Sequence, residues 1–112
     1  MIAINKFNYE AIVSKGDFFP FAFAFYDNEN NPLNIQEKVI LGIIDIETNE
    51  ILLEITGVNE NQNQVRFELT WEQLNKANIK VGEYLYDIFL TESKYTPFFE
   101  SKFIVKEVSH NV

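Results

Sequence analysis

The sequence predicts an all-β protein, an antiparallel β-sandwich of about seven strands with one short helix. Aromatic residues make up 15% of the chain, with eleven phenylalanines and five tyrosines, and such residues favour strands. Apolar and polar residues alternate over short runs, which turn residues interrupt at roughly ten-residue intervals. No linker, repeat or low-complexity segment divides the 112 residues. We therefore expect residues 1–112 to form a single domain.

The first two strands are expected in residues 7–13 and 18–26, with a turn at 14–17 between them. In the second strand, four phenylalanines fall on one face at the two-residue period of a strand: Phe19, Phe21, Phe23 and Phe25. Ala22 and Ala24 lie on the opposite face, and Pro20 belongs near a strand start, an edge or a bulge because it has no N–H. The Asn- and Asp-rich segment 27–32 is typical of a turn.

The middle of the chain predicts a hairpin followed by a strand that is buried on one face. Residues 38–46 are apolar on both faces, which is typical of a central strand. The turn 47–50 leads into a partner strand at 51–56, and the polar segment 57–63 predicts a loop. Beyond it, three apolar residues alternate with polar ones and are expected to face the core: Val65, Phe67 and Leu69.

A short helix is expected after Thr70. Thr70 and Gln73 have the spacing of a capping box, in which each side chain accepts a hydrogen bond from the other residue's backbone N–H. Leu74 and Ala77 supply an apolar side, and Asn78 is the expected C-cap. The helix then crosses over to a strand at 83–91, and the turn 92–96 leads to a last strand at 98–108.

The motif Val81-Gly82-Glu83-Tyr84-Leu85-Tyr86 is the most informative local pattern. Immunoglobulin-like sandwiches carry a tyrosine corner, a Tyr at the start of the penultimate strand whose hydroxyl bonds to backbone just upstream. Tyr84 would be the corner, following Gly82, and Tyr86 would occupy the inward position that is Cys in antibody domains. The alternative is two core tyrosines in an amphipathic strand. If Tyr84 is the corner, the expected sandwich is immunoglobulin-like. On both readings the two tyrosines have a structural role.

Composition disfavours several classes of partner. The net charge is −8, the wrong sign for binding nucleic acid or anionic membranes through basic residues. Cysteine is absent, so no thiolate chemistry or disulfide is expected. The start of the chain lacks a signal-peptide pattern, and no apolar run is long enough to span a membrane.

Catalytic and metal-binding patterns are weak. The single histidine, His110, lies in a tail expected to fray, and the four glycines form no phosphate-binding loop. Asp45 and Asp87 are expected to flank strand ends. The segment 27–31 offers oxygen ligands as a calcium loop does, but Pro32 and Lys38 stand where such a loop has Gly and Glu, which favours a solvated turn. We expect no enzyme activity, no metal and no cofactor.

Aromatic side chains that do not fit inside are the remaining functional candidates. Trp71, Tyr95 and Phe98 could form a protein-binding surface or a sugar-stacking platform. For Trp71, the structural alternative is that it fastens the short helix to the sandwich.

The order of motifs resembles the immunoglobulin-like domain at the N-terminus of bacteriophage baseplate upper proteins and similar small virion proteins. The resemblance spans residues 15–105 and rests on these motifs: Lys15-Gly16-Asp17, Phe25-Tyr26-Asp27, Asn31-Pro32-Leu33, Phe67-Glu68-Leu69-Thr70, Glu72-Gln73-Leu74, Val81-Gly82-Glu83-Tyr84-Leu85-Tyr86-Asp87-Ile88 and Lys102-Phe103-Ile104-Val105.

The resemblance implies a non-enzymatic virion protein of the baseplate, tail or capsid. It would be made in the host cytoplasm and assembled into the particle in many copies, docking onto other structural proteins. The alternative is a module that binds carbohydrate or a host surface through Trp71 and Tyr95.

Overall fold

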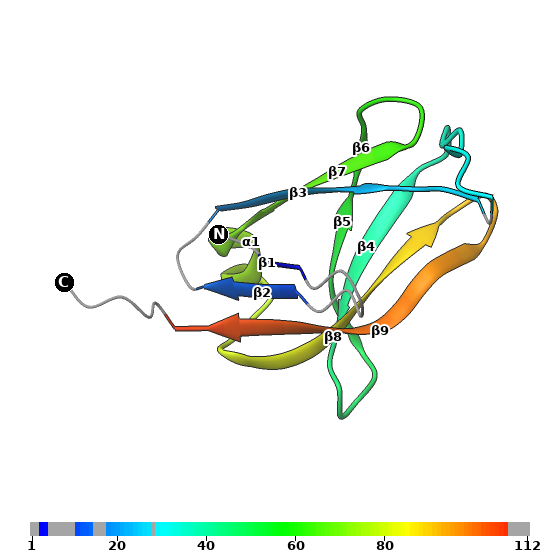
Figure 1. Ribbon diagram of the computed structural model, residues 1–112. Coiled ribbons are helices and arrows are strands. Elements are labelled where there is room, and N and C mark those ends of the chain that lie inside the picture. The colour runs from blue at the N-terminus through cyan, green and yellow to red at the C-terminus, as the bar shows by residue number, and fades with distance from the viewer. Residues whose placement is uncertain (1–2, 5–10, 15–17, 28, 108–112) are drawn as a thin grey trace.

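The protein consists of two β-sheets and one short helix, as the all-β prediction requires (Figure 1). The computed structural model describes residues 3–4, 11–14, 18–27 and 29–107. The larger sheet has six strands in the order β1 (Ala3–Ile4), β2 (Ala11–Ser14), β9 (Tyr95–Lys106), β8 (Gly82–Leu90), β4 (Val39–Ile44) and β5 (Ile51–Thr56). The smaller sheet has the order β3 (Phe18–Ala24), β7 (Gln64–Thr70) and β6 (Val58–Asn59).

Strand pairing is antiparallel in both sheets except for β2 and β9, which are parallel. The expectation of a wholly antiparallel sandwich is wrong at this pair. The two strands come from opposite ends of the chain, so no hairpin constrains their relative direction.

The core fills the space between the two sheets. The larger sheet contributes the inward residues of β2, β4, β5, β8 and β9, and the smaller sheet contributes alternate residues of β3 and β7. Its most completely buried members are Val13, Val39, Leu41, Ile43, Val65, Phe67, Leu69, Leu74, Ile79, Tyr86, Ile88 and Phe103. The predicted inward face of β7, with Val65, Phe67 and Leu69, is therefore confirmed.

Phe23 of β3 and Phe25, just beyond its end, are buried, as the period-two pattern predicts. Phe23 meets Phe67 of β7 edge to face, with ring centroids 6.1 Å apart. The side chains of Phe19, Phe21 and Phe99 lie outside the described part of the chain, as do residues 7–10 of the first predicted strand, 15–17 and 109–112.

The segment 57–63 is not wholly a loop. Val58–Asn59 form β6, which pairs with β7. A two-residue strand is too short to show a sequence period, so pattern reasoning missed it. Its position is set by tertiary contacts: the Gly57 N–H donates to Val39 O, and the Asn59 side chain donates to the carbonyls of Ile35 and Glu37.

The helix α1 (Trp71–Lys76) begins with the predicted capping box. The Thr70 hydroxyl accepts the Gln73 N–H at 3.2 Å, and the Gln73 side chain accepts the Thr70 N–H at 2.8 Å. The C-cap is Ala77 and not Asn78. Asn78 is the next residue and has φ 60°, a left-handed conformation that Asn tolerates after a helix. Within the described residues, no helix has the length and apolar character needed to cross a membrane.

Candidate functional site

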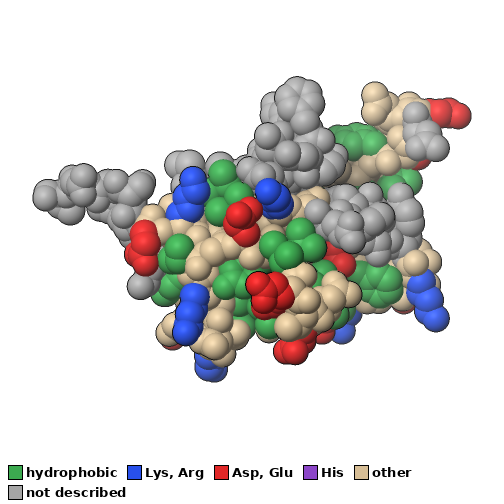
Figure 2. Space-filling view, turned by 90° about the horizontal axis from the view of Figure 1, so that it is seen from below, with side chains coloured by type: hydrophobic (Ala, Val, Ile, Leu, Met, Phe, Trp, Pro, Cys, Tyr) green, Lys and Arg blue, Asp and Glu red, His purple; other side chains and the backbone are tan. Residues whose placement is uncertain are grey.

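The outward-facing side of the six-stranded sheet, here called the outer face, has apolar side chains on five of its strands. Inward and outward positions alternate along each strand, so the residues between the buried ones of β2, β4, β5, β8 and β9 point away from the core. Those that are apolar are Ile12, Ile40, Ile44, Ile51, Leu85, Phe89 and Ile104. All are partly buried except Ile51, which is 56% exposed. Figure 2 shows one side of the molecule with hydrophobic side chains exposed between separate acidic and basic ones.

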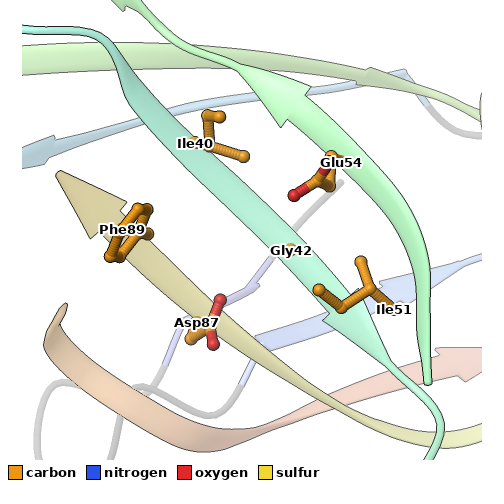
Figure 3. A pocket seen from close by; sticks show the side chains of 6 residues that line it. All are labelled: Ile40, Gly42, Ile51, Glu54, Asp87 and Phe89. Carbon is orange, nitrogen blue, oxygen red and sulfur yellow. The ribbon is translucent and has the colours of Figure 1, made fainter. Parts of the chain in front are cut away.

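Gly42 lies at the centre of a hollow in this face. It pairs with Glu54 of β5 on one side and with Asp87 of β8 on the other, so the three residues form a row across three adjacent strands. Figure 3 shows the Glu54 and Asp87 side chains on either side of Gly42. The hollow has a volume of about 290 Å³ and is completed by Ile40, Ile51 and Phe89.

The missing side chain of Gly42 makes this space. A Cβ at position 42 would lie 3.2 Å from Asp87 Oδ1 and 4.0 Å from Ile51 Cγ2. A side chain at position 42 would therefore crowd the Asp87 carboxylate and reduce the space in the hollow.

Asp87 is an acid in an unfavourable place. Burial among the apolar side chains raises its pKa above the ordinary value of 3.8, and repulsion from Glu54 raises the pKa further. Among the described residues, none donates a hydrogen bond to Asp87 or Glu54 and none forms an ion pair with them. The prediction that Asp87 flanks a strand end is wrong, because it lies in the middle of β8.

Elsewhere on the outer face, one acid lies beside a base of the neighbouring strand. Lys102 Nζ of β9 lies 3.3 Å from Glu83 Oε1 of β8, and both side chains are more than half exposed. The acidic pair beside Gly42 has no such cation among the described residues.

Tyr84 makes the hydrogen bonds expected of a tyrosine corner. Its hydroxyl accepts the Lys80 N–H at 2.9 Å and donates to the Lys80 carbonyl at 2.8 Å. Gly82 has φ 153°, a conformation that favours glycine. Tyr86 is 1% exposed and meets Phe103 edge to face. These residues fix the start of β8 and have a structural role.

Trp71, a sequence-predicted interaction residue, is half-buried and packs against the core. It also lines a second hollow, of about 310 Å³, with Asn75, Lys80 and Glu107. Although Tyr95 and Phe98 belong to β9, their side chains lie outside the described part of the chain. The structure therefore does not bring the three predicted aromatics together as one described surface.

The carboxylates of Asp27, Asp45 and Glu37 stabilise turns by accepting backbone hydrogen bonds. Asp27 accepts the N–H groups of Glu29 and Asn31, and Asp45 accepts those of Glu47 and Thr48; these bonds lower the pKa of each acid. In the calcium-loop alternative for 27–31, Asp27 would be a metal ligand. Its carboxylate already accepts backbone hydrogen bonds within the same turn.

Glu37 has the same role between distant segments, which sequence reasoning missed. Its carboxylate accepts the backbone N–H groups of Glu92 and Ser93, in the turn between β8 and β9, together with the Ser93 hydroxyl. Hydrogen bonds from Ser93 lower its pKa. In the described part of the chain, no group of three or more His, Cys, Asp or Glu side chains is placed to hold a metal ion.

The outer-face residues were also not proposed from the sequence as a site. Two signals could have found them: residues 38–46 are apolar on both faces, and Asp87 falls at an outward position between Leu85 and Phe89. Both signals gain meaning only when Glu54 is placed opposite Gly42, which depends on strand register.

No protein-family model matches the chain, and no curated protein matches its sequence.

Proposed function

We propose that the chain is an immunoglobulin-like domain that acts by docking, without catalysis, onto other structural proteins of a bacteriophage particle. It would serve in the baseplate, in the tail or as a capsid decoration. The observation that carries the docking function is the apolar outer face of the six-stranded sheet.

Strand order supports the immunoglobulin-like assignment. The strands β2, β9, β8, β4 and β5 correspond in order to the larger sheet of such a domain, and β3, β7 and β6 to the smaller one. The Tyr84 hydroxyl bonds to the backbone upstream of β8, and Tyr86 is buried two residues later. Both features stand where a tyrosine corner and the following inward residue belong.

The outer face supports docking because a sheet face exposed to water normally alternates to polar residues. Here the outward positions of β4 are Ile40, Gly42 and Ile44, and Leu85 and Phe89 flank them on β8. Contiguous apolar surface with a few polar groups is typical of a protein-binding patch.

The phage setting rests on the resemblance of residues 15–105 to baseplate and virion proteins. Its best-described part is Val81 to Ile88, the segment that holds the tyrosine corner and Asp87. Multiple symmetric copies in a particle would suit a small domain with one broad apolar face.

The test is cosedimentation with phage particles assembled in the cell that carries the gene. We expect the wild-type protein to sediment with the particles and Phe89→Glu to remain in the supernatant, because a charge at the centre of the face prevents burial. Val58→Glu is the matched control, since Val58 is an exposed apolar residue of the other sheet. Absence of the wild-type protein from particles, or equal loss with both variants, would overturn the proposal.

Carbohydrate binding remains the second candidate, favoured by the hollow beside Trp71 with its polar lining of Asn75, Lys80 and Glu107. Glycan-array binding that is retained in Phe89→Glu and lost in Trp71→Leu would favour it. Absence of binding to any glycan would remove it.

A further inference from the structure

We infer that the hollow over Gly42 receives a lysine or arginine side chain of a protein partner, flanked on that partner by apolar residues. This inference rests on the proposed docking function and specifies the chemistry of the partner. It is carried by the position of the two carboxylates, by the lack of a cation beside them among the described residues and by the apolar rim.

The two carboxylates are spaced for a cation between them. Adjacent strands lie about 4.8 Å apart, so the Cα atoms of Glu54 and Asp87 are separated by about 10 Å across Gly42. Both side chains line the same hollow (Figure 3). A guanidinium or ammonium group above Gly42 would meet a carboxylate on each side, and an arginine could pair with both.

The smaller sheet contains the arrangement that the hollow lacks. On its outward side, Arg66 of β7 forms ion pairs with Glu60 and Glu68. There, a cation of the chain itself lies between two acids. At the hollow, Gly42 occupies the central position, and no described residue supplies the cation.

Asp87 gains most from such a partner. Its carboxylate is partly desolvated and repelled by Glu54, which disfavours the ionised form. A partner cation beside Asp87 would favour the ionised form of its carboxylate. Docking would therefore remove the free-energy cost that ionised Asp87 has in the free protein. The apolar rim of Ile40, Ile51 and Phe89 would exclude water and strengthen the pair.

A second copy of the chain is a poor occupant. Each copy has a net charge of −8, and Lys102 of the same face is already paired with Glu83. Face-to-face pairing would bring two acidic surfaces together at an electrostatic cost.

The experiment is an NMR titration of the full chain with the blocked peptide Leu-Arg-Leu, and with Leu-Gln-Leu as the uncharged control peptide. We expect the arginine peptide to shift the amide signals of Gly42, Glu54 and Asp87. The double variant Glu54→Gln/Asp87→Asn should weaken its binding by about five- to ten-fold. The matched variant Glu29→Gln/Glu92→Gln, with the same change of net charge in exposed turns, should bind as the wild type does.

The pH dependence adds a second readout. Binding should weaken as the pH falls through the raised pKa of Asp87, because protonation removes one carboxylate. Equal binding of both peptides, equal loss in both double variants, or shifts confined to other surfaces would overturn the inference. So would a dimer seen by sedimentation equilibrium that Glu54→Gln/Asp87→Asn abolishes, since a second copy would then occupy the hollow.

Cosedimentation separates this inference from the proposed function. If Glu54→Gln/Asp87→Asn sediments with particles as the wild type does while Phe89→Glu does not, the cation inference fails and docking stands. If the wild type does not sediment with particles, the phage function fails, while the peptide titration still decides whether the hollow binds a cation.

Discussion

The acidic residues on the outward sides of the two sheets have different charged neighbours. On the three-stranded sheet, Arg66 forms ion pairs with both Glu60 and Glu68. On the six-stranded sheet, Glu54 and Asp87 flank Gly42 within an apolar surface and have no cationic partner among the described residues. The acids of the first side therefore have a cation of the same chain beside them, whereas those of the second side have none in the described part of the chain.

The comparison shows that alternation alone does not identify a solvent face. The same period of two underlies both sheets, and both bury one set of residues completely. The two sheets differ in the residue types at their outward positions. Four pairs of variants follow from these differences in environment.

The largest effect is expected from removing a ring from inside the sandwich, compared with removing one from outside. Phe67 of β7 is 0% exposed and contacts Phe23, so Phe67→Ala should lower the free energy of unfolding by about 3–5 kcal/mol. Phe89→Ala on the outer face should cost less than about 1.5 kcal/mol, because Phe89 is only partly buried. Urea denaturation measures both, and equal losses would contradict the division between core and outer face.

The second comparison uses two glycines. At Gly57, an added Cβ would lie 2.3 Å from Val65 Cγ1 and 2.9 Å from Phe67 Cε1, beneath the smaller sheet. Gly57→Ala should therefore cost about 1–3 kcal/mol through overpacking. Gly42→Ala meets only the Asp87 carboxylate and the end of Ile51, so its effect should be within about 0.5 kcal/mol. Thermal unfolding of the two variants distinguishes them, and a larger loss at Gly42 would mean that the hollow is not open.

The third comparison removes the cation of the smaller sheet. Arg66→Gln leaves Glu60 and Glu68 without their partner and should lower the stability by about 0.5–1 kcal/mol, since the ion pairs are partly exposed. The effect should decrease in high salt because ions screen exposed charges. Lys102→Gln, which breaks one more exposed pair, is the control and should have a smaller effect. An unchanged stability for Arg66→Gln would remove the proposed contrast in charge balance.

The smallest effect is expected at Asp87 and has the opposite sign. Because the folded state raises its pKa, ionised Asp87 disfavours folding at neutral pH, and Asp87→Asn should raise the melting temperature there. The penalty diminishes as the pH falls through the raised pKa and is gone below the ordinary value of 3.8. The difference between variant and wild type should vanish over the same range.

Asp45→Asn is the matched control for this pH dependence. Backbone N–H groups of Thr48 and Glu47 lower the pKa of Asp45, so its carboxylate stabilises the folded state above 3.8. That contribution is lost as the pH falls through the lowered pKa. The variant should thus be less stable than the wild type at neutral pH. The same sign for both variants would contradict the different environments assigned to the two acids.

Local patterns in the sequence were sufficient for most of the strands and for the start of the helix. Alternation placed Val65, Phe67 and Leu69 in the core, and the spacing of Thr70 and Gln73 predicted the capping box. These features depend on contacts between near neighbours, so a short window of sequence contains the required information. The parallel pairing of β2 with β9 and the hydrogen bonds of Glu37 escaped prediction because their partners are distant in sequence. The strand β6 was missed because two residues are too few to show a period.

The candidate site is one of the features that the sequence alone did not predict. By itself the sequence determined an all-β chain, the identity of most inward residues and an acidic character that disfavours nucleic acid. Only the tertiary structure decided that Gly42 lies between Glu54 and Asp87, because that row depends on the register of three strands. A shift of one residue in either pairing would turn the acid to the opposite side of the sheet. The hollow and its unbalanced charge are therefore products of register, which no single segment of the chain specifies.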